Sequence, residues 1–216
     1  DMDDSSIAKV VLRAMNESVL TKGKEYSYAL MDEERSRITS LLRNNGYYRF
    51  TLDNVTFVID TFDKSLFRNA ESPFQSAINF ISTTKNTGKP TVDINIYIRI
   101  TDDSLAYKKH YVRSVTVYPD FKSAADLTDS TMITNTIDSI TFKYHKKYVH
   151  ANVLYQHIYL SPGTLYSQAE FDKTIVKLNE LGIFQYLRIQ PREERRNRGT
   201  MDIDILLKKK KKYDFS

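Results

Sequence analysis

The sequence has no cysteine and no tryptophan, and its 216 residues include only 6 glycines and 5 prolines. Without cysteine, the chain has neither a disulfide scaffold nor thiolate metal ligands nor a cysteine nucleophile. No apolar run approaches the ~18–20 residues that a membrane-spanning helix needs. The scarcity of glycine and proline, beside 15 tyrosines and 11 phenylalanines, argues against long disordered tracts and indicates a folded protein.

The positive charge of the chain is concentrated at one end. The formal net charge is +5, and five consecutive lysines occupy positions 208–212, so the remainder of the chain is neutral. A nucleic-acid-binding face spreads its basic residues over a folded surface. The charge distribution therefore argues against a nucleic-acid partner. The chain also begins at Asp1 with neither an initiator methionine nor a signal sequence, so we expect it to be a fragment of a longer protein.

The most informative feature is a degenerate internal repeat. Each copy has a glycine, a tyrosine and a serine before a helical stretch, and a glycine followed by an aromatic residue after it. The positions are Gly23, Tyr26, Ser27, Gly46 and Tyr48 in the first copy and Gly163, Tyr166, Ser167, Gly182 and Phe184 in the second. Both copies close on an alternating strand, at residues 92–98 and 201–207.

The second copy contains the clearest helix. Its apolar positions fall on one helical face; they are Phe171, Ile175, Leu178 and Leu181. Ser167 and Glu170 have the spacing of a capping box, in which each side chain accepts a hydrogen bond from an unpaired backbone N–H. Gly182 stands where a residue in the left-handed conformation ends a helix. The start, the face and the end of the helix agree.

The remaining elements are predicted from periodicity. Further helices are expected around residues 7–14, 31–42 and 153–159, the last with Asn152 as its N-cap. Alternating strands are expected at residues 55–59, 111–118 and 184–190. We expect a linker at residues 102–108 and insertions at 61–90 and 121–151, with a short helix at 74–81 and an extended segment at 140–144. The predicted domains are therefore residues 1–102 and 103–216.

This ordered pattern resembles the polypeptide-transport-associated (POTRA) domains of BamA/TamA-like outer-membrane assembly proteins, of the Bacteroidetes type. The residues that carry the likeness are the 162–167 and 178–184 segments, the closing strand 201–205 and the looser first copy. The resemblance implies an α+β fold of two tandem modules, each a three-stranded mixed sheet with two helices on one face. It also implies that the first module lacks its first strand and that the second lies next to a C-terminal membrane barrel.

A function follows from the resemblance. The chain is expected to be a chaperone-like arm at the periplasmic face of the outer membrane of a Gram-negative bacterium, with no enzymatic activity and no cofactor. Its partners would be unfolded outer-membrane proteins, a partner assembly or translocation protein, and its own barrel. The strand after the glycine–aromatic corner is the candidate open edge for β-augmentation, at residues 50–59 in the first copy. In the second copy it comprises Phe184, Gln185, Tyr186, Leu187, Arg188, Ile189 and Gln190.

Three alternatives remain open from the residues. The first is a POTRA-like interaction module of a cell-division or two-partner secretion system, and the second is a nucleic-acid-binding α+β domain. The third is a hydrolase that uses Asp202 and Asp204, which share a strand face; alternating aspartates in a half-buried strand are more often its solvated side. For the candidate edge strands, coverage by neighbouring domains is as good an interpretation as an open edge.

The histidines and the basic clusters have ordinary interpretations. His110, His145, His150 and His157 do not have the spacing of a metal site, so no metal is expected. Arginines at 192, 195, 196 and 198 precede the last strand and the lysines at 208–212 follow it. The two clusters should lie at opposite ends of the module. The lysines are candidates for contact with anionic lipid headgroups, but a solvated, charge-protected strand end is the slightly favoured explanation. The repeated glycines, Tyr166 and Phe184 are interpreted as structural.

Overall fold

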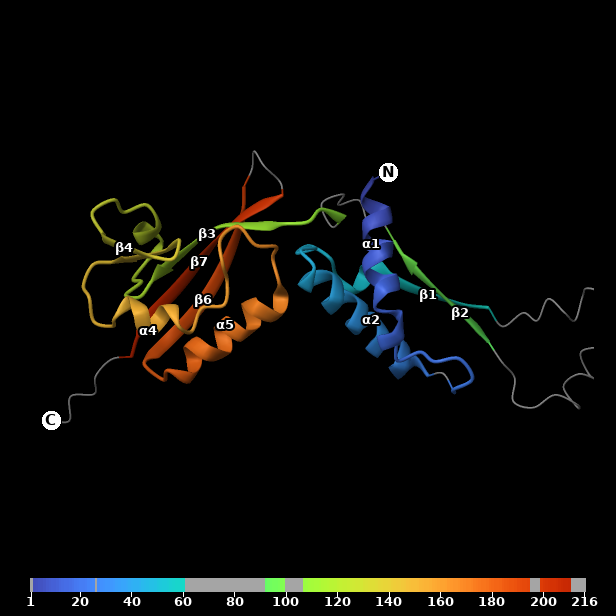
Figure 1. Ribbon diagram of the computed structural model, residues 1–216. Coiled ribbons are helices and arrows are strands. Elements are labelled where there is room, and N and C mark those ends of the chain that lie inside the picture. Colours follow the sequence, from blue (N-terminus) through green and yellow to red (C-terminus); the bar gives the residue numbers. More distant parts are fainter. Residues whose placement is uncertain (1, 26, 61–91, 100–106, 195–198, 211–216) are drawn as a thin grey trace, which may run out of the picture.

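The computed structural model describes residues 2–25, 27–60, 92–99, 107–194 and 199–210 (Figure 1). Over these residues the chain is α+β and has two sheets: one of two strands and one of five. The insertion predicted at 61–90, with its helix at 74–81, lies outside the described residues. Tyr26 and most of the predicted linker lie outside them too. No described helix has the length and the apolar character needed to cross a membrane.

The first module consists of two helices and the two-stranded sheet. Its elements are α1 (Met2–Arg13), α2 (Tyr28–Asn44), β1 (Val55–Asp60) and β2 (Asp93–Ile98). Strands β1 and β2 are antiparallel, with Val55 opposite Ile98. The helices pack their apolar stripes on one another and on the sheet, and the fully buried side chains at the centre are Ile38, Leu42, Tyr47 and Phe50. The predicted helices and strands of this module are thus confirmed within the described residues.

Helix α2 begins and ends as the repeat predicts. The Ser27 hydroxyl accepts a hydrogen bond from the Leu30 N–H at the first turn. The chain leaves the helix through Gly46, whose φ of +94° is a conformation that residues with a Cβ avoid. The segment after Gly46 differs from prediction, because residues 50 and 51 have no regular structure, residues 52–54 form a short 3₁₀ helix (Leu52–Asn54), and the strand begins only at Val55. The predicted open edge at 50–59 is therefore shortened to its second half.

The second module is built on the five-stranded sheet, in the order β4-β5-β3-β7-β6. Its strands are β3 (Tyr111–Tyr118), β4 (Ile133–Ile137), β5 (Ile140–Tyr144), β6 (Phe184–Glu193) and β7 (Thr200–Lys209). Strand β3 is central and runs parallel to both β5 and β7, while the β6–β7 and β4–β5 pairs are antiparallel. Helices α4 (Ala151–Tyr155) and α5 (Gln168–Glu180) lie together on one side of this sheet (Figure 1).

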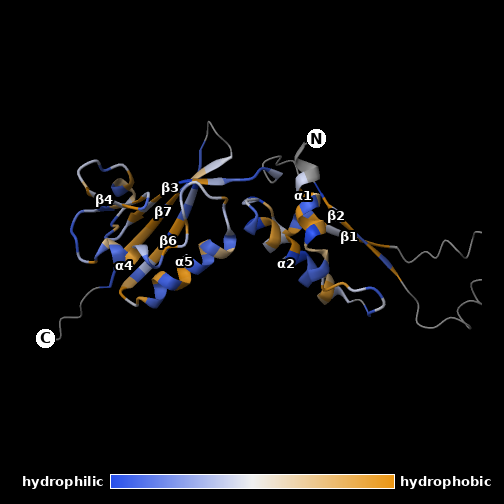
Figure 2. Cartoon of the chain, viewed as in Figure 1, coloured by the Kyte–Doolittle hydropathy of each residue, from blue (hydrophilic) through white to orange (hydrophobic). Residues whose placement is uncertain are grey.

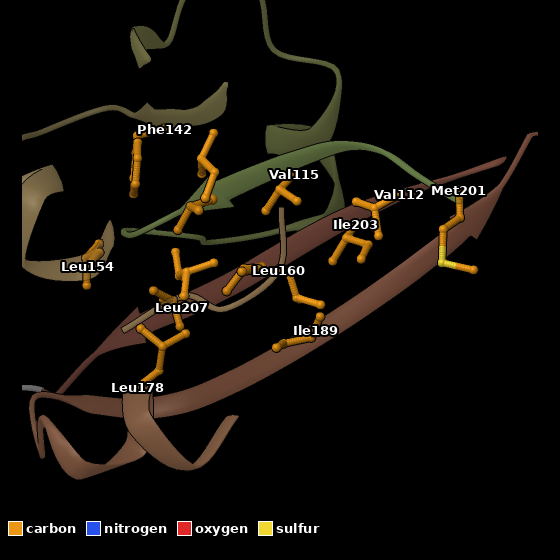
Figure 3. Close-up of a cluster of buried hydrophobic side chains, with 14 of the residues drawn as sticks. Val112, Val115, Phe142, Leu154, Leu160, Leu178, Ile189, Met201, Ile203 and Leu207 are labelled. Carbon is orange, nitrogen blue, oxygen red and sulfur yellow. The ribbon is translucent and has the colours of Figure 1, made fainter. Parts of the chain in front are cut away.

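One large apolar core joins these helices to the sheet. Inward side chains of β3, β5, β6 and β7 meet those of α4, α5 and the segment between them, as Figure 3 shows for Val115, Phe142, Leu154, Leu178 and Ile203. Figure 2 shows apolar and polar residues alternating along β6 and β7 and both kinds on α5. The buried stripe of α5 passes through Thr174 and Leu178, and its Ser167 cap accepts from the Glu170 N–H.

The predicted mixed three-stranded unit is present as β3-β7-β6, and the insertion at 121–151 enlarges it. The segment predicted to be extended at 140–144 is β5, which pairs with β3. The sequence did not predict β4, which forms a hairpin with β5 through Asp138 and Ser139, both at positive φ. The predicted N-cap of the short helix was also wrong: α4 begins at Ala151 with His150 in the capping position.

Candidate binding edge and inter-module joint

Strand β6 contains the residues predicted for partner binding, and it lies at one end of the sheet. The edge is interrupted twice. A β-bulge shifts the register between Phe184 and Tyr186, and Pro191 has no N–H to offer a further strand. Between these two points the edge is regular over Tyr186 to Gln190, opposite Lys208 to Asp204 of β7. The usable part of the predicted edge is this five-residue stretch.

The direction of the backbone groups on β6 follows from one hydrogen bond. The Glu194 N–H donates to the Thr200 carbonyl at 3.0 Å, so Glu194 faces β7. In an antiparallel pair, residues alternate between facing the partner strand and facing away. Arg188 and Gln190 therefore direct their backbone groups to β7. Leu187 and Ile189 direct theirs to the open side.

The two faces of this edge differ in chemistry. Ile189 and Phe184 are buried in the apolar core on the helical side, and Leu187 is half-buried beside them. On the other face, Tyr186 and Arg188 are exposed. A strand added to β6 would thus meet apolar side chains on one of its faces and polar ones on the other.

The second site is the joint between the two modules, which is formed at the Gly46 corner of the first module. The Gly46 carbonyl accepts a hydrogen bond of 2.8 Å from the His110 N–H at the start of the second module. A Cβ at position 46 would stand 2.8 Å from Cδ2 of Leu165. The positive φ favours glycine here, and a Cβ would also require the end of the Leu165 side chain to shift.

Aromatic rings fill the joint behind this corner. Tyr48 of the first module lies edge-on to Tyr166, with ring centroids 5.0 Å apart, and edge-on to His110 at 5.8 Å. Tyr166 is buried, and its hydroxyl donates to Oε1 of Gln168 at 2.6 Å. Burial raises the pKa of Tyr166 to about 12. The same burial lowers the pKa of His110 below its usual 6.5, although the Glu193 carboxylate, 3.8 Å from Nε2, acts in the opposite direction.

Polar contacts close the rim of the joint. Arg49 donates from Nε and Nη2 to the two carboxylate oxygens of Glu193, at 2.6 and 2.7 Å. Arg43 donates to Oε1 of Gln168 at 2.6 Å. The Asn44 side-chain oxygen accepts from the Ala169 N–H at 2.8 Å, so that a residue of α2 satisfies a free amide in the first turn of α5. A pocket of about 400 Å³ opens beside these groups, lined by Arg43, Tyr48, Arg49, Thr51 and Glu193.

The repeated motif residues either begin and end the secondary-structure elements or form the joint between the modules. Gly182 ends α5 at φ +66°, and Gly163 and Gly23 also have positive φ. Ser167 caps α5, Phe184 starts β6 in the core, and Gly46, Tyr48 and Tyr166 meet in the joint. The sequence indicated that these residues are structural, but it did not predict that residues of the two copies contact one another. Tyr26 lies outside the described residues.

The paired aspartates are not a solvated face, which corrects the interpretation made from the sequence. Asp204 is 1% exposed and forms an ion pair of 2.5 Å with Arg192. Asp202 binds Arg113 and the Ser114 hydroxyl, and the Arg113 guanidinium holds the pKa of the Asp202 carboxyl below its usual range. A small second core, formed by Tyr118, Met132 and Leu206, covers this side of the sheet. Both carboxylates thus have partners that fix them in place.

The other candidate sites have structural surroundings. His145 lies 3.3 Å from the Asp126 carboxylate within the insertion. Nδ1 of His157, just beyond the end of α4, lies 2.8 Å from the Val153 carbonyl of that helix. Within the described ranges, no group of three potential metal ligands comes together. Arg192 lies near the β6–β7 turn, whereas Lys208, Lys209 and Lys210 lie at the other end of β7, so the two basic clusters are separate there.

Comparisons with known proteins find similar folds among solved structures only. No protein-family profile and no curated protein sequence matches the chain. Among solved structures, BamA from Haemophilus ducreyi lacking POTRA domains 1–3 is 10% identical, with a TM-score of 0.54 over 97% of this chain and 27% of that one. BamA POTRA domains 3–5 from Haemophilus influenzae are 13% identical, with a TM-score of 0.47 over 95% of this chain and 55% of that one.

The similarity to BamA is one of fold. The alignment with the Haemophilus ducreyi protein covers almost the whole chain and therefore includes both modules. The chain is therefore an α+β protein with the fold of tandem POTRA modules, as its internal repeat predicted. It spans about a quarter of the length of that BamA structure.

Proposed function

We propose that this chain is the periplasmic interaction arm of an outer-membrane protein assembly or translocation factor, and that it binds extended segments of client or partner proteins along β6. The observation that carries the proposal is the regular stretch of edge strand from Tyr186 to Gln190 in a POTRA-type fold. Outward backbone groups of Leu187 and Ile189 supply the hydrogen bonds. Main-chain pairing tolerates many sequences, which suits a module that meets many clients.

The two faces of the edge define the segment that fits it. A strand with alternating apolar and polar residues would place its apolar side chains beside Leu187 and Ile189, on the side of α5. Its polar side chains would lie beside Tyr186 and Arg188. This alternation is the pattern of a transmembrane β-strand of an outer-membrane protein. Chemistry at the edge thus favours unfolded barrel strands over uniformly polar or uniformly apolar segments.

The joint gives the arm a defined shape in this proposal. We place the module boundary near residue 102, with the first module at 1–102 and the second at 103–216. The Tyr107 side chain, just beyond that boundary, packs in the first core. Hydrogen bonds, rings and the Arg49–Glu193 pair then hold the modules together. A rigid arm presents the β6 edge at a fixed position relative to whatever the second module is attached to.

A proline substitution tests the proposed edge directly. Leu187→Pro removes an outward N–H without removing a hydrogen bond to β7, because proline is tolerated on the solvent side of an edge strand. Leu187→Ala is the matched control, since it shortens the side chain and keeps the N–H. Binding of fluorescent barrel-strand peptides is measured by anisotropy. Loss of binding in Leu187→Pro with retention in Leu187→Ala supports the proposal, and equal binding by both variants overturns it.

A further inference from the structure

The insertion at 121–151 gives the second module another open edge. Strand β5 pairs with β3 and covers the side of β3 that β7 leaves open, so β4 becomes the far edge of the sheet. The hairpin is tight, since Ile137 and Ile140 are paired and only Asp138 and Ser139 lie between them, at φ of 43° and 70°. Positive φ at both central residues is the geometry of a type I′ turn.

The β4 edge lacks the protection that the β6 edge has. Folded proteins guard edge strands with lysine, arginine, proline or a bulge, and β6 carries a bulge, Arg188 and Pro191. Strand β4 reads Ile133-Thr134-Asn135-Thr136-Ile137, with no charge and no proline. Its first four side chains are exposed, including Ile133 at 53%. Beyond the ladder with β5, the described part of the chain offers no backbone hydrogen bond to this strand.

The sequence of β4 is the same in both directions around Asn135. We propose that two copies of this chain associate through β4, paired antiparallel about a two-fold axis at Asn135. Thr134 of one copy then lies opposite Thr136 of the second, and Ile133 lies opposite Ile137. Threonine pairs and β-branched apolar pairs are favourable cross-strand neighbours. Asp138 falls opposite Met132, so no like charges oppose one another.

The direction of the backbone groups fits this register. In a β-turn the carbonyl of the first residue faces the N–H of the fourth, so the Ile137 carbonyl faces β5. By alternation, Asn135 also faces β5, whereas Thr134 and Thr136 face the open side. The two Thr134–Thr136 pairs across the axis therefore exchange hydrogen bonds. Asn135 meets its own counterpart in a non-hydrogen-bonded pair.

The contact closes on itself and is small. A two-fold interface uses the same patch on both copies and stops at a dimer, here with the two five-stranded sheets joined into one. A ladder of five residues is well below the size of a stable protein–protein interface. We therefore expect a weak, concentration-dependent association, which a covalent trap at the axis would capture.

The absence of cysteine from the whole sequence makes this trap specific. Residues opposite each other in a non-hydrogen-bonded pair have Cα atoms about 4.5 Å apart, within the roughly 4.4–6.8 Å that a disulfide bridges. Asn135→Cys under mild oxidation is expected to give a disulfide-linked dimer on a non-reducing gel. Arg188→Cys, on the β6 edge, is the matched control and is expected to remain monomeric.

A second substitution separates strand pairing from chance collision. Thr136→Pro, added to Asn135→Cys, removes an outward N–H and is expected to abolish the cross-linked dimer. If circular dichroism shows that Thr136→Pro unfolds the chain, Thr136→Lys is used in its place, since a charge at the strand edge opposes pairing. Equal dimer from Asn135→Cys and Arg188→Cys, or a dimer that persists with Thr136→Pro and with Thr136→Lys, overturns the proposal. In amide hydrogen exchange, the Thr134 and Thr136 amides should become protected as the protein concentration rises. Protection of these amides by an extended peptide but not by raising the protein concentration would overturn the proposal in favour of a peptide-binding site.

Discussion

The Arg49 guanidinium of the first module donates two hydrogen bonds, of 2.6 and 2.7 Å, to the two carboxylate oxygens of Glu193 in the second module. The two residues are 144 positions apart in the sequence. Two-pronged arginine–carboxylate pairs are stronger and more directional than single contacts. Glu193 also ends β6, so this pair connects the joint between the modules to the strand proposed to bind clients.

The Arg49–Glu193 pair is expected to couple the two modules by about 1 kcal/mol, because both groups are partly exposed and water screens them. A double-mutant cycle with Arg49→Ala and Glu193→Ala, followed by urea unfolding, measures this coupling. Arg49→Lys should lose most of it, since an ammonium group cannot make the paired contact. Full retention of the coupling in Arg49→Lys would contradict the two-pronged geometry.

The Gly46→Ala substitution is expected to lower the free energy of unfolding by about 1–2 kcal/mol, mainly through the positive φ and in smaller part through the displacement of the Leu165 side chain. Gly23→Ala is the matched control, because Gly23 has φ +83° and open space around its Cβ position, and should cost about 1 kcal/mol. Adding Leu165→Ala should recover part of the loss in Gly46→Ala only. Equal losses at both glycines would show that the Leu165 side chain shifts away from an added Cβ without measurable cost.

Much of each module could be predicted from the sequence, because the signals are local. Ser167, the stripe through Leu178 and Gly182 define α5 without reference to the rest of the chain. The β4–β5 hairpin was missed because its turn is Asp138-Ser139, which lacks the glycine that usually marks such turns. The burial of Asp204 was missed because it depends on residues about 80 positions earlier, Tyr118 at the end of β3 and Met132 in the insertion.

The joint shows the same limit more clearly. Gly46, Tyr48 and Tyr166 were identified as structural residues because each marks a corner of its own copy. Nothing local indicates that the corner of one copy packs against the other, since the contacts join residues more than 100 positions apart. The edge position of β6 was predicted, but through the resemblance to POTRA domains and not through the residues themselves.

Acid is expected to destabilise the joint through His110. Burial holds the folded-state pKa of His110 below 6.5, so the unfolded chain binds a proton that the folded chain does not. Stability therefore falls as the pH drops below about 6.5, by up to about 1.4 kcal/mol per unit. The charge of Glu193 and a hydrogen bond with the Lys108 backbone oppose this shift, while the charges of Arg49 and Lys108 reinforce it. Urea unfolding between pH 7 and 5 should show a weaker pH dependence for His110→Phe than for wild type, and an equal pH dependence in both would contradict this account.

The buried carboxylate on the far side of the sheet depends on its partner. Arg192→Met leaves Asp204 buried without its ion pair and should lower the free energy of unfolding by about 1–2 kcal/mol, less than for a fully buried pair because the Arg192 side chain is half-exposed. Arg188→Met, on the same face of β6, is the control and should change stability by about 0.5 kcal/mol or less. Thermal or urea unfolding measures both, and similar losses would show that Asp204 does not rely on Arg192.

The central claim, that β6 pairs with an extended client segment, is tested most directly by amide hydrogen exchange on the labelled chain with and without a barrel-strand peptide. We predict an alternating result. Arg188 and Gln190 amides, which face β7, are protected in the free chain, while the Leu187 and Ile189 amides become protected only when the peptide binds. Peptide binding that leaves Leu187 and Ile189 unchanged would contradict edge pairing at β6.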